Sequence, residues 1–408
     1  MNFALAMPRR IVFGAGSIAK LDDLAHPLGR RFLLVFSRSI ARETRLDETL
    51  RSQLISRGHA AAIVTVSGEP QAQDVDDHVL TARSFGADCV IGVGGGSTLD
   101  LAKAVAAIAA QPAAHGAAHG ETAGLPPPVT EYLEGVGTGR TLVARPLPLL
   151  LAPTTAGTGS EATRNAVIGS REKAFKKSLR GDGLLAEVAV VDPALCKNCP
   201  VSTIATSGLD AVTQLIEPYL SQGANPLTDA LVERALPGAV RALPIAWRDP
   251  TGAAEHIWAD LCFASLCGGI ALTNAGLGAV HGLAAALGAR YPIPHGTLCA
   301  ALLAATLEAN RNALFAQNTA QPVLERMAQL GRWMCGREDL SRDQGIAHAI
   351  DAVRALTAEF GIPGLEALGV RREDYPAILA DSRGGSSMRF NPVALNAQQL
   401  EWILEQAR

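Results

Sequence analysis

Six short apolar runs between residues 10 and 195 most restrict how this chain can fold, because helical stretches separate them. Near-continuous apolar runs of this length are typical of parallel strands that are buried on both faces. The alternation predicts a doubly wound α/β domain over residues 1–195, with ligands beyond the carboxyl ends of its strands. The predicted strands are RIVFG, RFLLVFS, HAAAIVTV, DCVIGVG, LPLLLAPTT and EVAVVDP.

After Pro193 the strand signals stop, and helical periodicity continues to the end of the chain. Residues 226–247, 255–273 and 321–334 have the apolar spacing of packed helices. A chain of 408 residues is also too long for one ordinary core. We therefore predict an all-α second domain over residues 196–408.

Charge and composition indicate that the ligand is a small molecule. The net charge is −3 and no Lys/Arg-rich run appears, so neither nucleic acid nor an anionic membrane surface is an expected partner. No stretch reaches the roughly 18 uninterrupted apolar residues of a membrane span, and the N-terminus has no basic region followed by an apolar one. Seven cysteines, an odd number, fit a reducing compartment, and we expect a soluble cytoplasmic protein.

Two glycine-containing loops follow predicted strands and suit a nucleotide. In CVIGVGGGSTLDLAK, Gly94, Gly95 and Gly96 let the backbone approach a phosphate at the start of a helix. Ser97 and Asp100 have the spacing of a capping box, so their alternative role is to begin that helix. The second loop offers Thr154, Thr155 and Thr158 among glycines, and an ordinary Ser/Thr-rich turn explains it equally well in isolation.

Four polar side chains of the helical half could form a metal site. Asp210 and Gln214 lie four residues apart and share one helix face. His281 and His295 lie in or beside a stretch rich in Gly, Ala and Leu. An acid, an amide and two imidazoles could bind Zn, Fe, Mn or Ni, although each histidine alone is more often a satisfied core residue. The histidines of HGAAH (His115 and His119) lie in a Gly/Pro-rich stretch that indicates a surface loop.

Five motifs, in order, resemble the iron-containing (group III) alcohol dehydrogenases, which share a fold with dehydroquinate synthase. These are GGGSTLDLAK, APTTAGTGSE, DPAL, GLDAVTQLIE and GAVHGL…YPIPHG, and the resemblance covers nearly the whole chain. It implies an N-terminal Rossmann-like domain, a helical C-terminal domain, a nicotinamide cofactor in the cleft between them, and a divalent metal, Fe or Zn, on the helical side.

The resemblance also assigns residues. It implies a pyrophosphate on the loop from Gly94 to Ser97, a nicotinamide near the hydroxyl loop, and a cofactor lysine at Lys176 or Lys177. The implied cofactor-binding residues are Gly94, Gly95, Gly96, Ser97, Asp100, Thr154, Thr155, Thr158 and Lys176. The implied metal ligands are Asp210, Gln214, His281 and His295.

Two residues depart from the family pattern. Gln214 stands where the family has a histidine, and its neutral oxygen is a poorer ligand for Fe or Zn, so metal affinity should fall. Ala285 stands where many members have a further histidine. Near the cofactor, Ser37 and Arg38 follow the second strand where NAD-specific folds place an acid, which favours NADP over NAD. The alternative is that Arg38 is simply a solvated charge.

The predicted function is reversible hydride transfer between the nicotinamide and a small alcohol or aldehyde. A metal would polarise the substrate oxygen. In its absence, His281 or His295 would supply the proton or hydrogen bond. The alternatives are a dehydroquinate synthase-like lyase and a nucleotide-binding protein without a metal, and the resemblance further implies a homodimer or larger assembly.

Overall fold

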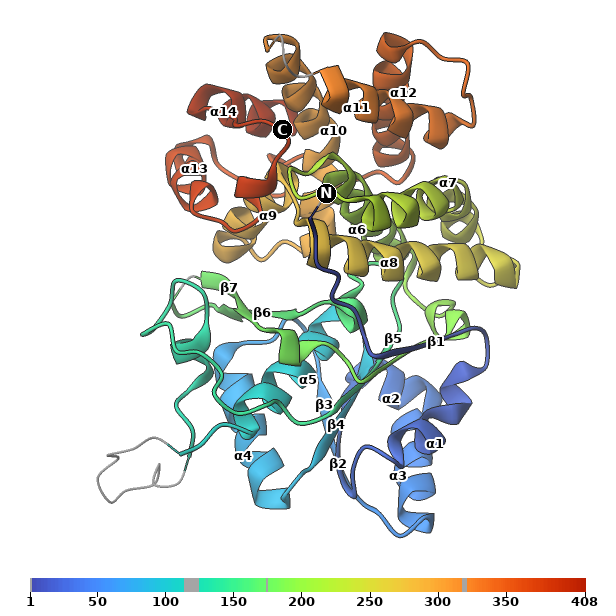
Figure 1. The fold of residues 1–408 in the computed structure, drawn as a ribbon, viewed down its shortest axis with the longest axis vertical. Coiled ribbons are helices and arrows are strands. Elements are labelled where there is room, and N and C mark those ends of the chain that lie inside the picture. Colours follow the sequence, from blue (N-terminus) through green and yellow to red (C-terminus); the bar gives the residue numbers. More distant parts are fainter. Residues whose placement is uncertain (1, 114–124, 174, 318–320) are drawn as a thin grey trace. The chain divides into compact units, whose positions relative to one another are not determined.

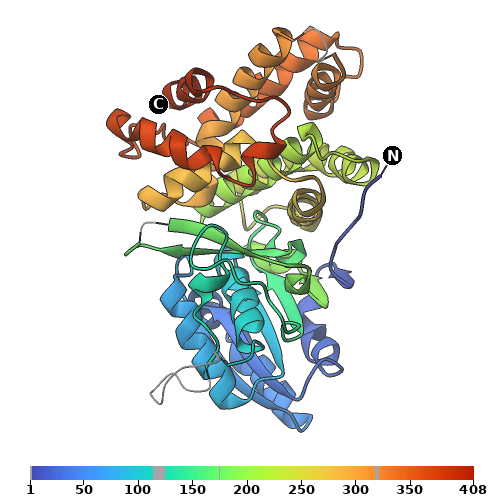
Figure 2. The same ribbon diagram turned by 60° about the vertical axis from the view of Figure 1, so that its left-hand side comes forward.

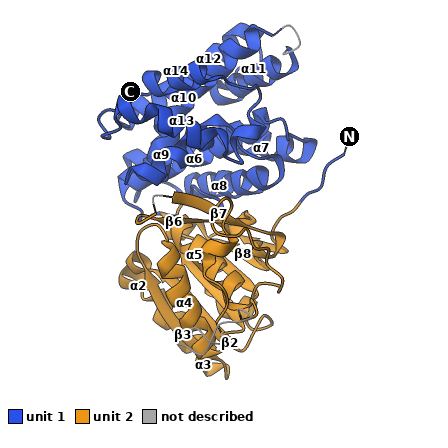
Figure 3. Ribbon diagram, turned by 90° about the vertical axis from the view of Figure 1, so that its left-hand side faces the viewer, with its two compact units in different colours: residues 1–5, 156–159, 197–408 blue, residues 6–155, 160–196 orange. Residues whose placement is uncertain are grey.

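The computed structural model describes residues 2–113, 125–173, 175–317 and 321–408 (Figure 1). The chain divides into two compact units (Figure 3). The α/β unit contains residues 6–155 and 160–196, and the helical unit contains residues 1–5, 156–159 and 197–408. His115 and His119 lie outside the described residues.

The α/β unit is built on a six-stranded parallel sheet with the order β1-β8-β5-β4-β2-β3. This confirms the predicted fold class, and each strand falls on one of the six apolar runs. The chain passes from β2 outward to β3 and then returns to the other side of β2 to form β4, so the topological switch point lies between β2 and β4. The strands are β1 (Arg10–Phe13), β2 (Arg31–Ser37), β3 (Ala60–Val66), β4 (Cys89–Gly94), β5 (Leu149–Pro153) and β8 (Val188–Val191).

Helices cover both faces of this sheet (Figure 1). Side chains of α4 (Ala72–Phe85) and α5 (Gly96–Ala109) form one apolar cluster with the sheet. On the other face, α1 (Leu21–Ala25), α2 (Arg38–Thr44) and α3 (Leu46–Ser56) contribute to a second cluster. Burial on both sides explains why the strands have near-continuous apolar sequences.

An antiparallel hairpin was not predicted. Strands β6 (Asn165–Ser170) and β7 (Phe175–Arg180) pair with each other; they are labelled in Figure 1, and Figure 2 shows the same ribbon from another side. Only a few of their side chains, such as Ile168 and Leu179, join the cluster formed by α4 and α5. The sequence FKKSLR is too polar to indicate a strand from apolar content alone.

The helical unit has one continuous core to which most of its helices contribute. Helix α8 is the one described helix long and apolar enough to cross a membrane, but 72% of its apolar window is buried, which accounts for its composition. The helices are α6 (Val201–Leu220), α7 (Pro226–Arg248), α8 (Glu255–Ala275), α9 (Ala279–Arg290), α10 (His295–Phe315), α11 (Gln321–Cys335), α12 (Arg342–Glu359), α13 (Tyr375–Arg383) and α14 (Ala397–Gln406).

Candidate functional site

The two predicted cofactor loops adjoin at the carboxyl edge of the sheet. The Thr154 N–H, just after β5, donates to the Gly94 carbonyl at the end of β4 (3.0 Å). A Cβ added to Gly95 would lie 3.4 Å from the Thr155 side chain, so a larger residue would fill the space between the loops. Helix α5 begins at Gly96 and directs its first N–H groups here. The edge therefore has the backbone form of an anion site beside the switch point.

Asp100 is tied into the α/β unit by its own contacts. Its carboxylate accepts hydrogen bonds from the Ser160 hydroxyl (2.6 Å) and the Val167 N–H (2.9 Å). The capping-box interpretation of Ser97 and Asp100 is wrong, because Gly95 is the N-cap of α5 and no side chain caps it. Asp100 joins α5 to the hairpin instead.

The remaining predicted cofactor residues occupy three places. Ser37 is the N-cap of α2 and accepts from the Ile40 N–H (3.4 Å). Arg38 is exposed at the first position of that helix, on the β2 side of the switch point. Lys176 lies on β7 and donates to Glu69 (2.6 Å), and Thr158 belongs to the short segment of the helical unit.

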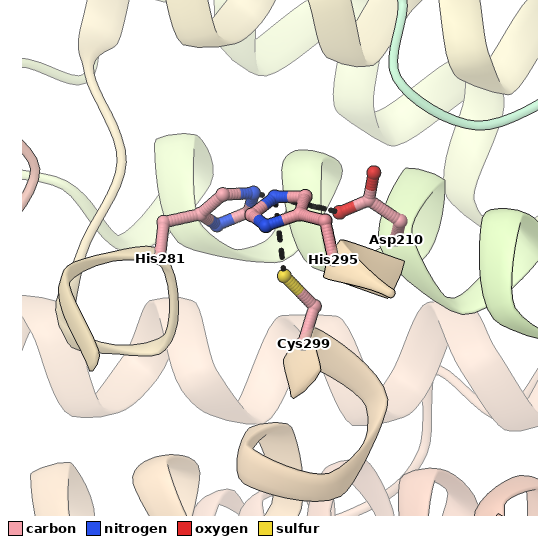
Figure 4. A group of neighbouring side chains, drawn as sticks. All are labelled: Asp210, His281, His295 and Cys299. Atoms are coloured by element: carbon pink, nitrogen blue, oxygen red, sulfur yellow. Dashed lines mark hydrogen bonds and ion pairs between the residues drawn. The ribbon is translucent and has the colours of Figure 1, made fainter. Parts of the chain in front are cut away.

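Three predicted metal ligands converge within the helical unit, and a cysteine joins them (Figure 4). Asp210 lies in the middle of α6, His281 in the first turn of α9, and His295 at the first position of α10. Cys299 follows His295 by four residues, so both project from one face of α10. The ligand atoms of these four residues all lie within 4.8 Å of one another.

Two atoms of this cluster, Asp210 Oδ1 and His281 Nε2, lack the hydrogen-bond partners that burial demands within the part of the chain that the structure describes. Asp210 Oδ1 lies 3.5 Å from His281 Nε2 and 3.9 Å from His295 Nε2, and Cys299 Sγ lies 3.6 Å from His295 Nε2. Asp210 is 1% exposed and His281 6% exposed, yet neither Asp210 Oδ1 nor His281 Nε2 has a hydrogen-bond partner among the described residues. Buried polar atoms without partners are costly, and a cation between them would remove that cost. The four donors therefore fit a divalent metal.

Glu217 orients His281. It lies seven residues after Asp210 on the same face of α6, and its Oε2 accepts a hydrogen bond from His281 Nδ1 (2.6 Å). Its Oε1 accepts from the Val280 N–H at the start of α9 (2.7 Å). A Cβ on Gly278 would lie 2.8 Å from that oxygen, so the close approach requires glycine. With Nδ1 bonded to Glu217, Nε2 is left to face the cluster.

Gln214 does not turn toward the cluster. Its Nε2 donates to Asp210 Oδ2 (2.9 Å), which is the oxygen that the cluster does not use. Its Oε1 faces α8, where a Cβ on Gly268 would lie 3.6 Å away. The Gln214 amide therefore holds the Asp210 carboxylate by the oxygen that points away from the cluster.

The electrostatics of the cluster favour positive charge. Burial acts to lower the pKa of His281, but Cys299, Asp210 and Glu217 outweigh it, so the pKa lies well above its usual value. Burial acts to raise the pKa of Asp210, but His281 and His295 hold it below the usual value. Burial raises the pKa of the Cys299 thiol to about 12. A divalent cation would interact with the same acidic groups.

Sequence reasoning missed Glu217 and Cys299. Their positions could have been read from helical spacing, because Glu217 shares a face with Asp210 and Cys299 shares one with His295. A buried cysteine usually acts as a small apolar residue, so the sequence around Cys299 did not indicate that it belongs to a polar cluster. Cys196 and Cys199, which form the CxxC pair of the motif CKNC, do not belong to the converging group found among the described residues.

Comparisons with known proteins agree with this geometry. A model of "Iron-containing alcohol dehydrogenase" matches residues 8–193, and a model of the C-terminal part of the same family matches residues 204–408. The "Probable alcohol dehydrogenase EutG" of Escherichia coli is 32% identical over 399 residues, which are 97% of this chain and 92% of that protein.

Two solved structures are similar along their whole length. A 1,3-propanediol oxidoreductase has a TM-score of 0.86 and 30% identity, with 100% of both chains covered. A sulfoacetaldehyde reductase from Bifidobacterium kashiwanohense, solved in complex with NAD+, has a TM-score of 0.82 and 26% identity, with 99% of this chain and 98% of that chain covered.

Proposed function

Because this chain belongs to the iron-containing alcohol dehydrogenase family, we propose that it interconverts a small alcohol and its aldehyde or ketone by hydride transfer with NAD(P). The observation that carries the proposal is the pair of buried, unpartnered ligand atoms, Asp210 Oδ1 and His281 Nε2. The relatives named as alcohol dehydrogenase, propanediol oxidoreductase and sulfoacetaldehyde reductase support small oxygenated substrates.

Asp210, His281 and His295 would hold the metal. The metal would act as a Lewis acid that polarises the substrate oxygen and stabilises an alkoxide. Glu217 keeps the proton of His281 on Nδ1, so that Nε2 presents a lone pair. The carboxylate and the imidazoles come from different helices, so their alignment depends on the packing of α6, α9 and α10.

The cofactor would lie at the carboxyl edge of the sheet. Gly94, Gly95 and Gly96 would place backbone N–H groups against its pyrophosphate, and the hydroxyls of Thr154 and Thr155 adjoin this loop. Arg38, exposed at the start of α2, would pair with a 2′-phosphate, which supports NADP as the preferred form.

The test is oxidation of NADPH and NADH with a panel of small aldehydes, before and after chelation. Asp210→Asn should abolish most activity, while Glu172→Gln, an exposed change in the α/β unit, should leave it unchanged. Turnover that is lost on chelation and restored by metal supports the proposal. Cofactor binding without turnover would indicate a non-catalytic nucleotide-binding protein, and phosphate release would indicate a lyase.

A further inference from the structure

We propose that Cys299 binds the metal as a thiolate and completes an Asp-His-His-Cys centre, while Gln214 only positions Asp210. The inference rests on the proposed function, because it concerns the metal centre of that activity. It assigns residue 214 a role outside the ligand set, in place of the ligand role implied by the resemblance.

The spacing of the donor atoms matches one small ion. A tetrahedral Zn²⁺ has metal–ligand distances of roughly 2.0–2.3 Å for O, N and S, which place neighbouring ligand atoms about 3.3–3.6 Å apart. Three of the six separations are 3.5 Å from Asp210 to His281, 3.6 Å from Cys299 to His295, and 3.9 Å from Asp210 to His295, and the other three do not exceed 4.8 Å. Small side-chain movements would therefore bring all four donors onto one ion.

The amide nitrogen of Gln214 is already engaged by Asp210, while its buried Oε1 has no hydrogen-bond partner among the described residues. In its hydrogen-bonded orientation Nε2 donates to Asp210 Oδ2, and the ligand oxygen that a metal would need faces α8. Reversing the amide would place its oxygen against the carboxylate oxygen and lose that hydrogen bond. Ligation by Gln214 would thus disrupt the residue that fixes Asp210, whereas ligation by Cys299 replaces its weak contact with His295 Nε2 (3.6 Å), an atom that would bind the same ion.

The donor set selects a class of metal. One carboxylate, two imidazoles and one thiolate suit Zn²⁺ and similar late transition ions, and disfavour Mg²⁺ and Ca²⁺, which prefer oxygen ligands. When the bond forms, the Cys299 S–H bond breaks, the proton passes to water, and the electron pair on sulfur is shared with the ion. Neither partner changes its oxidation state, so no oxidant or reductant is needed.

Cobalt(II) provides a direct test, because a thiolate ligand gives a sulfur-to-cobalt charge-transfer band in the near ultraviolet. The full-length protein would be stripped with a chelator and titrated with Co²⁺, and Zn²⁺ affinity would be measured by competition with a chromophoric chelator. We expect the band at one Co²⁺ per chain in the wild type. Cys299→Ser should abolish the band and weaken Zn²⁺ binding by about 100-fold or more, beyond the roughly 10–100-fold loss typical of an outer partner.

Matched variants separate the roles. Gln214→Ala should keep the band and weaken Zn²⁺ binding by roughly 10-fold, as expected of a residue that only orients a ligand. Cys89→Ser places the same change at a fully buried cysteine of the α/β unit and should keep both the band and the affinity. If Cys299→Ser does not fold, Cys299→Ala gives the same comparison, and a wild type that binds Co²⁺ without the band still overturns the proposal.

Binding of Co²⁺ by the wild type without the band, a band that survives Cys299→Ser, or no Co²⁺ binding at all would overturn the proposal. The cobalt spectrum and the aldehyde-reduction assay separate failure of this ligand assignment from failure of the proposed function. A band without any aldehyde reduction would support the ligand assignment and refute the activity. Metal-dependent reduction without the band would do the reverse.

Discussion

Replacing Glu161 by glutamine should stabilise the α/β unit increasingly as the pH rises from 5 to 8. Glu161 lies in a short 3-10 helix (Ser160–Ala162) and is 1% exposed. Neither of its carboxylate oxygens has a hydrogen-bond partner among the described residues. Burial raises the pKa of this carboxyl from 4.5 to about 7, although the charge of the buried Lys103 acts in the opposite direction.

The sign follows from proton linkage. Between pH 4.5 and about 7 the folded state holds the Glu161 proton more tightly than the unfolded state does, so wild-type stability falls as the pH rises and stays low above this window. At about 1.4 kcal/mol per pKa unit, the full penalty is about 3 kcal/mol, of which most develops between pH 5 and 8. Glutamine has no charged form to bury, so the variant avoids this loss.

The measurement is urea denaturation followed by circular dichroism at several pH values. The free energy of unfolding of Glu161→Gln minus that of the wild type should increase by about 2.5 kcal/mol from pH 5 to pH 8. Subtracting the two curves removes the titration of groups that both proteins share. The exposed control Glu172→Gln should give a flat difference curve. A flat curve for Glu161→Gln would refute the argument that a carboxylate without hydrogen-bond partners among the described residues is buried here.

Three further changes probe the site. Glu217→Gln should weaken Zn²⁺ binding by roughly 10–100-fold in a chelator competition, because His281 loses the carboxylate that fixes its Nδ1 proton; unchanged affinity would contradict this role. Arg38→Ala should raise KM for NADPH by about tenfold or more while leaving KM for NADH nearly unchanged, as the loss of a charged hydrogen bond predicts; an equal effect on both would show that Arg38 does not discriminate between them. Gly95→Val should preserve thermal stability, because the backbone at Gly95 is extended. It should lower NADH affinity by at least about tenfold in a fluorescence titration, since the valine side chain would enter the space beside Thr155. Wild-type affinity in this variant would place the pyrophosphate elsewhere.

The sheet could be predicted from the sequence because burial on both faces leaves a strong apolar signal in each strand. The hairpin could not, since half-exposed strands such as β7 carry Lys176 and Lys177, whose polarity resembles that of a loop. Pairing between β6 and β7 depends on their packing against α5, which is a tertiary contact. Local patterns do not contain that information.

The candidate metal centre was predictable only in part, because it too depends on tertiary contacts. The resemblance pointed to Asp210, His281 and His295, but only the packing of three helices shows that their ligand atoms meet. Cys299 was not predicted, because a cysteine in an apolar helix normally indicates core packing. Glu217 lies three residues after Gln214, and its function becomes visible only when α9 starts against it.

If the Cys299 thiolate binds the metal in place of a neutral ligand at residue 214, the net charge of the metal centre falls. With Asp210 and Cys299 both anionic, a divalent ion in this centre would be neutralised by its own ligands, whereas a neutral ligand at residue 214 would leave a net positive charge. A neutralised ion attracts the electrons of a substrate oxygen less strongly, so it stabilises an alkoxide less. Oxidation and reduction pass through the same transition state, in which negative charge lies on the substrate oxygen, so a weaker Lewis acid slows both directions of hydride transfer. Measurement of kcat/KM in both directions for Cys299→Ser loaded with excess Zn²⁺, compared with the wild type, would show whether the thiolate weakens the Lewis acid: we expect a parallel rise in the variant, and no rise would contradict the argument.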